Sequence, residues 1–215
     1  MPSKLVIAID GPAGAGKSTI AKLLASRLDL RYLDTGAMYR ALALKAERKG
    51  IEGAAAADLM TSTTIAFGAG DPQRVLLDGE DVTTAIRTAE IGEAASALSS
   101  HPPVRRAMVA LQQEFVAEGG VVLEGRDTTT VVAPNAGLKL YLTASLEERA
   151  KRRSTERGDT EAFERTRSEI ELRDHRDITR DDSPLSVAPG AHVIETATLS
   201  IDEVMEKVVA LLPSS

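Results

Sequence analysis

The feature that most constrains this chain is a glycine-rich turn between an apolar run and a segment of helical periodicity. Residues 10–19 read DGPAGAGKST and follow the run LVIAI, and Gly11, Gly16, Lys17 and Ser18 match the pattern G-x-x-x-x-G-K-[ST]. Glycines allow a tight turn whose backbone N–H groups converge on a phosphate chain at the positive end of the next helix. A strand, a phosphate-binding loop and a helix are therefore expected in this order.

Each residue of the turn has an expected role in binding a nucleoside triphosphate. The predicted nucleotide-binding residues are Gly11, Pro12, Ala13, Gly14, Ala15, Gly16, Lys17, Ser18 and Thr19. The Lys17 ammonium group is expected at the β- and γ-phosphates, and the Ser18 hydroxyl is the expected metal ligand. The predicted cofactors are ATP and Mg²⁺.

The loop does not name the acceptor, because GTPases, motor ATPases and small-molecule kinases share it. A GTPase needs the guanine-reading motif N-K-x-D. The only asparagine in the sequence is Asn135, which is followed by Ala136. A GTPase is therefore not expected.

Short apolar runs alternate with longer segments of helical periodicity, which predicts an α/β fold with a parallel sheet covered by helices. The five expected strands span residues 5–10, 31–33, 121–124, 138–143 and 192–195, and the two clearest helices span residues 17–28 and 103–118. Capping-box spacing marks two further helix starts, Ser145 with Glu148 and Ser200 with Glu203.

Composition limits the classes of function. The 215 residues are enough for one domain with a real core, and they include no cysteine, no signal-peptide pattern and no window of about 18 apolar residues. The net charge of −6 argues against a protein that binds nucleic acid regardless of sequence. We therefore expect a cytoplasmic monomer that acts on small molecules, with neither nucleic acid nor membrane as a partner.

Two segments interrupt the alternation of strands and helices. Residues 61–104 contain RVLLDGEDV, which predicts a β-hairpin around Asp78 and Gly79, and they are interpreted as a small inserted subdomain. Residues 150–182 are rich in charged side chains and are interpreted as a mobile helical lid. Some arginines near its start are open to two interpretations, contacts with ATP phosphates or ion pairs on a helix surface. They are Arg149, Arg153 and Arg157.

Polar residues follow two of the expected strands, at the edge where open α/β sheets bind ligands. Asp34 and Thr35 come at the end of the second strand, with Arg40 about a turn and a half farther along the next helix. Glu124, Arg126 and Asp127 come at the end of the third. Thr35 is a candidate helix cap, and a cap with a solvated arginine is the structural alternative for the first group. Charges directly after a buried strand are costly unless they have a function, so a ligand site is predicted here.

Six segments occur in a fixed order along nearly the whole chain: IDGPAGAGKST, YLDTGAMYR, LDGEDVT, EGRD, LTASLEERAKRR and RDHRDITR. This ordered set resembles the bacterial cytidylate kinases, which are nucleoside monophosphate kinases of the P-loop type. The resemblance implies a five-stranded parallel sheet flanked by helices, a monophosphate-binding insertion and a lid that closes over ATP. It also implies transfer of the γ-phosphoryl group of ATP to CMP or dCMP, which gives CDP or dCDP.

The resemblance also implies roles for the matching positions. Those at the CMP phosphate are Thr35, Arg40, Arg126 and Arg180, with Asp34 beside them. Those at the cytosine are Ser96, Arg105 and Asp127, and those at the ribose are Arg173 and Asp177. The predicted catalytic residues are Lys17, Arg126 and Arg180, since phosphoryl transfer depends mainly on positioning and charge stabilisation.

The residue types suit these roles. A carboxylate and a hydroxyl accept from the N4 amino group of cytosine but not from the O4 carbonyl of uracil, and the arginine fork matches phosphate oxygens. A P-loop kinase for UMP or a small alcohol, and a nucleotide-binding module without transfer, stay open as alternatives. The chain reads Thr128, Thr129 and Thr130 where family members have an apolar residue, Gly and Thr, so it departs from the family at the first two positions. Because threonine resists a positive φ, the resemblance does not fix the backbone here.

Overall fold

The glycine-rich turn follows a buried strand and precedes a helix, as its sequence context predicts. In the computed structural model, which describes residues 4–70, 72–158 and 162–213, β1 is Val6–Asp10 and α1 is Lys17–Leu28. The helix begins directly after Gly16, whose φ of 87° favours glycine. Regular structure therefore fixes the loop at both ends.

The chain divides into two compact units. The first comprises residues 1–32 and 115–215, and the second comprises residues 33–114. The five-stranded sheet is built mainly from the first unit, and a three-stranded sheet lies in the second.

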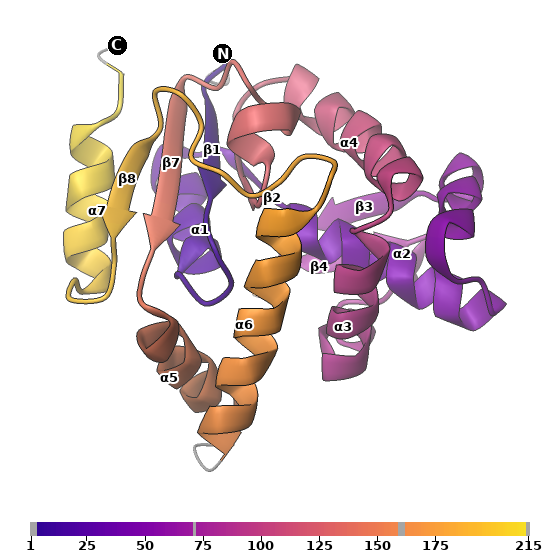
Figure 1. Ribbon diagram of the computed structural model, residues 1–215. Helices are drawn as coiled ribbons and strands as arrows, with labels where there is room; N and C mark the ends of the chain where they lie inside the picture. The colour runs from indigo at the N-terminus through magenta and orange to yellow at the C-terminus, as the bar shows by residue number, and fades with distance from the viewer. Residues whose placement is uncertain (1–3, 71, 159–161, 214–215) are drawn as a thin grey trace. The chain divides into compact units, whose positions relative to one another are not determined.

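The five-stranded sheet has the strand order β2-β6-β1-β7-β8 (Figure 1). β6 and β7 run parallel to β1 on either side of it, and β8 runs parallel to β7. The strands span Arg31–Asp34 (β2), Val121–Gly125 (β6), Leu138–Thr143 (β7) and His192–Glu195 (β8). Asp10 lies opposite Gly125 and Tyr141 in the register. The glycine-rich loop and the residues after β6 therefore leave the sheet at the same edge.

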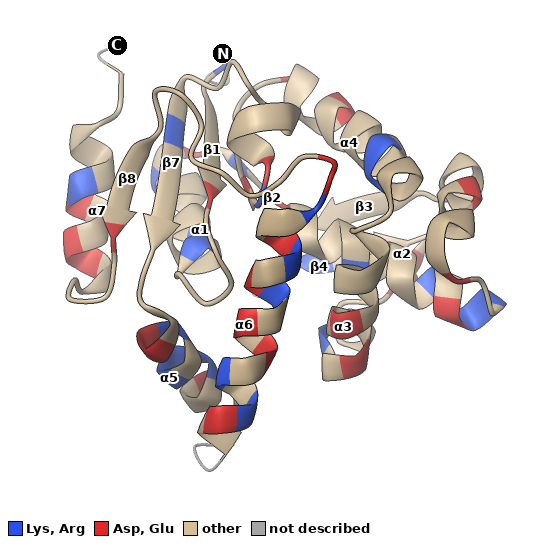
Figure 2. Cartoon of the chain, viewed as in Figure 1, with Lys and Arg blue, Asp and Glu red and all other residues tan. Residues whose placement is uncertain are grey.

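In the first unit, two helices with apolar faces pack on the five-stranded sheet, and two highly charged helices pack on each other. α1 and α7 (Ile201–Ala210) pack together, and their apolar side chains join a core with those of the sheet that includes Ile7, Leu24, Leu140, Ile194 and Val208. α5 (Leu146–Arg157) and α6 (Phe163–Thr179) pack on each other, and Figure 2 shows acidic and basic residues along both. None of the described helices combines the length and the apolar character needed to cross a membrane.

The second unit combines helices with antiparallel strands. Its helical segments are α2 (Thr35–Lys49), η1 (Gly53–Ser62), η2 (Ala85–Arg87), α3 (Ala89–Leu98) and the greater part of α4 (Pro102–Ala117). Its strands are β3 (Ile65–Gly68), β4 (Arg74–Leu77) and β5 (Glu80–Asp81). β4 and β5 form the predicted hairpin, and positive φ angles of 51° at Asp78 and 87° at Gly79 make its turn. Asp78 is held further by Lys45, whose Nζ lies 2.6 Å from Oδ2.

The predicted α/β class with a five-stranded parallel sheet is confirmed, and the element boundaries differ from the expected ones by a residue or two. Ser200 and Glu203 form a complete capping box. At Ser145 the hydroxyl accepts from the Glu148 N–H, but the Glu148 carboxylate accepts from Arg152 instead of returning a bond.

Two assignments of segments stay predictions. Residues 61–104 lie wholly within the second unit, and their role as a CMP-binding subdomain is untested. The proposed lid, residues 150–182, holds most of α5 and all of α6, while residues 159–161 lie outside the described residues.

Candidate active site

Close backbone approach explains the glycines of the loop. A Cβ added to Gly11 would lie 1.9 Å from the Leu142 carbonyl oxygen of β7. A Cβ on Gly14 would lie 3.0 Å from both the Cβ and the carbonyl oxygen of Arg149. Both glycines also have a positive φ, 147° and 78° respectively. The loop can take this shape only with glycine at these positions.

Lys17 lies buried at the start of α1 and donates from Nζ to the Pro12 carbonyl oxygen at 2.8 Å. The pKa of Lys17 is lowered to about 7, chiefly by burial and then by the charges of Arg126 and Arg173, while Glu124 and Asp10 partly oppose this shift. A bound anion beside Lys17 would favour the charged form of the amine and raise its pKa. Lys17 is therefore a candidate contact for an anionic ligand.

Ser18 is paired with Glu124, a carboxylate for which the sequence predicted no separate role. Its hydroxyl donates to Glu124 Oε1 at 2.5 Å, and the Tyr32 hydroxyl donates to the same oxygen at 3.2 Å. Glu124 lies opposite Ile9 of β1 in the sheet register. A hydroxyl and a carboxylate are oxygen donors of the kind that Mg²⁺ prefers. The available signal was a charged residue at the end of an apolar run, but the strand order that brings it to Ser18 was not readable from the sequence.

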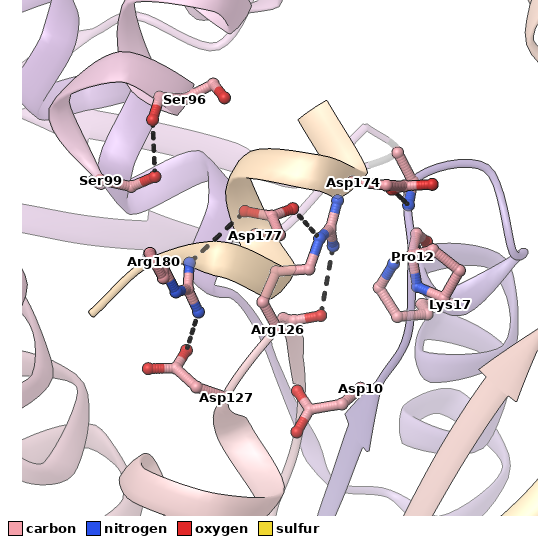
Figure 3. Close-up of polar contacts among 12 residues, drawn as sticks. Asp10, Pro12, Lys17, Ser96, Ser99, Arg126, Asp127, Asp174, Asp177 and Arg180 are labelled. Carbon is pink, nitrogen blue, oxygen red and sulfur yellow. Dashed lines mark hydrogen bonds and ion pairs between the residues drawn. The ribbon is translucent and has the colours of Figure 1, made fainter. Parts of the chain in front are cut away.

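Two arginines and two aspartates form a cluster beyond the end of β6 (Figure 3). Arg126 Nε donates to Asp177 Oδ2 at 2.8 Å, and Arg180 Nη1 lies 3.4 Å from Asp177 Oδ1. Arg180 Nη2 also lies 4.0 Å from Asp127 Oδ1. Burial alone would raise the pKa of Asp177, but the charges of Arg126, Arg173 and Arg180 hold it below its usual value. Both guanidinium groups are thus fixed by one ionised carboxylate.

The three threonines after Asp127 do not need the conformation of glycine. None of them has a positive φ, and they begin a π-helical turn over Thr128–Val132. Thr128 donates its N–H and hydroxyl to Asp10 Oδ1 at 2.9 and 2.7 Å. Thr129 does the same to Oδ2 at 2.7 and 2.5 Å. The departure from the family pattern therefore adds hydrogen bonds between the ends of β6 and β1.

In the second unit, Asp34 combines a capping role with an ion pair. It is the N-cap of α2 and accepts from the Ala37 N–H at 2.8 Å, so the expected cap at Thr35 lies one residue earlier. Arg40 Nη1 lies 3.9 Å from Asp34 Oδ2. Thr35 is buried beside them. The capping alternative is correct for Asp34.

Ser96 and Arg105 are buried polar residues of the second unit. Arg105 is only 1% exposed; it donates to the Ser99 carbonyl at 3.1 Å, and its guanidinium carbon lies 5.9 Å from the centre of the Tyr39 ring. The Ser96 hydroxyl has no hydrogen-bond partner within the part of the chain that the structure describes. Buried polar groups without partners are costly, so this hydroxyl is a candidate ligand contact.

The family model for cytidylate kinase matches residues 7–214. The chain belongs to the cytidylate kinase family. Among the relatives, the cytidylate kinase of Listeria monocytogenes serovar 1/2a is 46% identical over 98% of this chain and 97% of its own. The cytidylate kinase of Citrifermentans bemidjiense is 47% identical over 94% of this chain and 90% of its own. The sequence resemblance is therefore confirmed over nearly the whole length.

A solved gluconokinase from Sinorhizobium meliloti is similar in fold, with a TM-score of 0.51 at 14% identity, covering 96% of this chain and 90% of its own. At this identity the similarity supports the fold alone.

The predicted site residues of this cytidylate kinase family member fall into two sets. Those in the first unit are Lys17, Ser18, Arg126, Asp127, Arg173, Asp177 and Arg180. Those in the second unit are Asp34, Thr35, Arg40, Ser96 and Arg105. Within each unit the structure brings some of them into direct contact, Arg126 with Asp177 and Arg40 with Asp34.

The arginines of α5 have separate environments. Arg149 is buried and contacts the glycine-rich loop, while Arg153 is exposed and lies 3.2 Å from Glu156. The side chain of Arg157 lies outside the described part. Ordinary helix-surface pairing therefore accounts for Arg153 but not for Arg149.

Proposed function

We propose that this protein transfers the γ-phosphoryl group of ATP to CMP or dCMP and releases ADP and CDP or dCDP. The observation that carries the proposal is the relation between two groups of cations in the first unit. The loop with Lys17 leaves β1, and the Arg126 cluster follows β6, its parallel neighbour, at the same edge of the sheet. Two anions bound by these groups would meet at adjacent strand ends, as donor and acceptor phosphates must.

On the donor side, the loop amides and Lys17 hold the β- and γ-phosphates of ATP. Ser18 and Glu124 would hold Mg²⁺, which neutralises charge on the transferred group. The low pKa of Lys17 in the free protein, about 7, rises when a polyphosphate arrives, so the amine is charged in the complex.

On the acceptor side, the proposed CMP-phosphate residues of the first unit are Arg126 and Arg180, which share Asp177. In the second unit the family resemblance assigns the same role to Thr35 and Arg40, and Asp34 orients Arg40. The cytosine is read by Ser96, Arg105 and Asp127, and the ribose by Arg173 and Asp177. The Asp127 carboxylate would accept from the N4 amino group of cytosine and repel the O4 carbonyl of uracil.

In the transfer, an oxygen of the CMP phosphate forms a bond to the γ-phosphorus of ATP while the bond from that phosphorus to the β–γ bridging oxygen breaks. The electron pair of the broken bond remains on ADP. The acceptor phosphate is already anionic, so no general base is needed. Lys17, Arg126 and Arg180 stabilise the charge that moves between the two nucleotides.

The alternatives are a kinase for UMP or a small alcohol, and a module that binds nucleotide without transfer. An alcohol acceptor does not need paired guanidinium groups, which favours a monophosphate. We further propose that the protein acts as a monomer in the cytoplasm.

The test is a panel of acceptors with ATP and Mg²⁺ in a coupled assay of ADP release: CMP, dCMP, UMP, AMP and glycerol. We expect turnover with CMP and dCMP. A preference for UMP, AMP or glycerol would overturn the proposal, and ADP release from none of them would favour the binding module.

A second test addresses the assigned residues. Arg126→Ala and Arg40→Ala should each weaken CMP binding by about 10-fold or more, because each removes a charge-assisted bond to phosphate. Arg48→Ala is the matched control, since Arg48 makes an exposed pair with Glu80 at 2.7 Å. Asp127→Ala should reduce the preference for CMP over UMP more than it reduces ATP affinity. Unchanged CMP binding or unchanged preference would refute the corresponding role.

A further inference from the structure

Both polar groups of the Ala13 peptide backbone are bound by side chains from α5 and α6. The Ala13 N–H donates to Asp174 Oδ1 at 3.2 Å, and Arg149 Nη1 donates to the Ala13 carbonyl oxygen at 3.0 Å. Arg149 also forms an ion pair with Asp174 Oδ2. Ala13, Arg149 and Asp174 therefore close a ring of hydrogen bonds around one residue of the phosphate-binding loop, and Figure 3 shows Asp174 beside that loop.

The pair is buried, unlike the ion pairs on the surfaces of these two helices, such as Arg153 with Glu156 and Arg167 with Glu171. The side chains of Arg149 and Asp174 are 8% and 12% exposed. Arg149 Nε also donates to the Ala144 carbonyl oxygen at 2.9 Å, so the direction of its guanidinium plane is fixed. Removing one partner of a buried ion pair is destabilising, because the other charge is then left buried and unpaired. The two side chains are therefore expected to hold each other in one fixed arrangement.

A second connection joins α5 to the loop. Arg152 donates to the Thr196 carbonyl oxygen at 2.6 Å and to the Thr196 hydroxyl at 3.0 Å. That hydroxyl lies 3.3 Å from the Ala15 carbonyl oxygen. The close approach of Gly14 to Arg149 lies between these two connections. The first turns of α5 are therefore attached to the loop along residues 13–15.

The charge of Asp174 separates two interpretations of Arg149. If Arg149 served only to bind ATP phosphates, removing the Asp174 carboxylate would free its guanidinium, reduce the negative charge near the phosphates and tighten nucleotide binding. If the pair holds the loop in shape, removing the same carboxylate releases the Ala13 backbone and weakens binding. The sign of the effect decides between them.

We propose that Arg149 and Asp174 are positioning residues that hold the loop around Ala13 in its phosphate-binding shape and attach the inner ends of α5 and α6 to it. The proposal rests on the proposed ATP site. It assigns the Ala13 N–H to Asp174, so the phosphate-facing amides begin at Gly14.

The test compares Asp174→Asn, Arg149→Met and the double variant with the wild type by calorimetric titration of ADP. We expect each single variant to bind ADP about 10-fold more weakly, and the double variant to bind it no more weakly than the worse single one, since the residues act as a unit. Glu171→Gln and Arg153→Met are matched controls on the same two helices, both in exposed ion pairs. They should bind ADP as the wild type does.

Hydrogen exchange of the loop in the nucleotide-free protein gives a second readout that needs no ligand. The amide of Ala13 should exchange at least about 10-fold faster in both single variants than in the wild type, while the β7 amides stay protected. If Asp174→Asn fails to fold, Arg149→Lys keeps the charge but loses the fork, and it should show the same faster exchange.

Tighter or unchanged ADP binding in Asp174→Asn, or unchanged Ala13 exchange in the folded variants, would overturn the proposal. A wild type that binds ADP but does not phosphorylate CMP would refute the proposed function and leave this inference standing.

Discussion

Thr129 donates both its backbone N–H and its hydroxyl to one carboxylate oxygen of Asp10, at 2.7 and 2.5 Å. Asp10 ends β1 and is fully buried, and Thr129 follows the end of β6. The buried charge thus joins the strand that leads into the phosphate-binding loop to the segment that carries Arg126 and Asp127. Thr128 binds the other oxygen in the same way, so both oxygens of the carboxylate are satisfied.

Removing the Thr129 hydroxyl should therefore destabilise the protein. We expect Thr129→Val to lower the free energy of unfolding by about 1.5–3 kcal/mol, because a buried carboxylate loses a hydrogen bond. Thr129→Ser retains the bond and should lose less than about 1 kcal/mol, the scale of a single buried methyl group. Urea unfolding measures both. Thr130→Val is the control, since its hydroxyl makes only a 3.3 Å bond to the Asp127 carbonyl. Equal losses in all three variants would contradict the role of Asp10.

Nucleotide binding should be accompanied by proton uptake at Lys17. With a pKa of about 7 in the free protein, Lys17 is largely neutral at pH 8, and the phosphates of ADP raise its pKa so that it gains a proton. We expect net proton uptake on ADP binding at pH 8 and much less at pH 6, where Lys17 is already largely charged. Calorimetric titrations in buffers of different ionisation enthalpy measure the uptake.

Lys17→Arg is the control for this proton, because a guanidinium group stays charged at both values of pH. Its binding heat should not depend on the buffer at pH 8. Proton release by the wild type, or uptake that persists in Lys17→Arg, would show that another group titrates.

Two glycines of the loop should respond differently to the same substitution. Gly11→Ala places a Cβ against the Leu142 carbonyl oxygen of β7, so we expect a loss of more than about 4 kcal/mol or failure to fold. Gly16→Ala meets no atom within 4 Å and has only its φ of 87° to overcome, which costs about 1–2 kcal/mol. Urea unfolding of both variants gives the comparison. Similar losses of stability in the two variants would mean that glycine is needed at position 11 for its positive φ and not for the close approach of β7.

The sequence predicted those parts of the structure that local patterns determine. Short apolar runs between segments of helical periodicity indicated the five strands, and Asp78-Gly79 indicated the turn of the hairpin. Contacts between distant segments left no such pattern. Glu124 meets Ser18 only because β6 lies beside β1, and Asp174 meets Ala13 across 161 positions of the chain.

The threonines after Asp127 illustrate the same limit. Comparison with the family pattern raised the problem of a missing glycine, but the answer depends on a carboxylate at the end of another strand. The resemblance supplied roles for single residues, while the pairings that hold those residues in place became visible only in three dimensions.

The pairing of Ser18 with Glu124 predicts how Mg²⁺ affects nucleotide binding. Glu124→Gln removes a carboxylate near the phosphates, so ADP without metal should bind at least as tightly as in the wild type. The gain in ADP affinity on adding Mg²⁺ should fall by about 10-fold, because the metal loses an oxygen donor of full charge. Titrations of ADP with and without Mg²⁺ separate the two effects.

Tyr32→Phe is the matched control, since it removes only the 3.2 Å bond to Glu124 Oε1 and leaves the carboxylate charged. In this variant the gain in ADP affinity on adding Mg²⁺ should fall by less than about 3-fold, since only one hydrogen bond of ordinary strength is lost. If Glu124→Gln weakened ADP binding equally with and without Mg²⁺, Glu124 would instead support the loop through the Ser18 hydroxyl, and the metal would take its other ligands from the nucleotide and water.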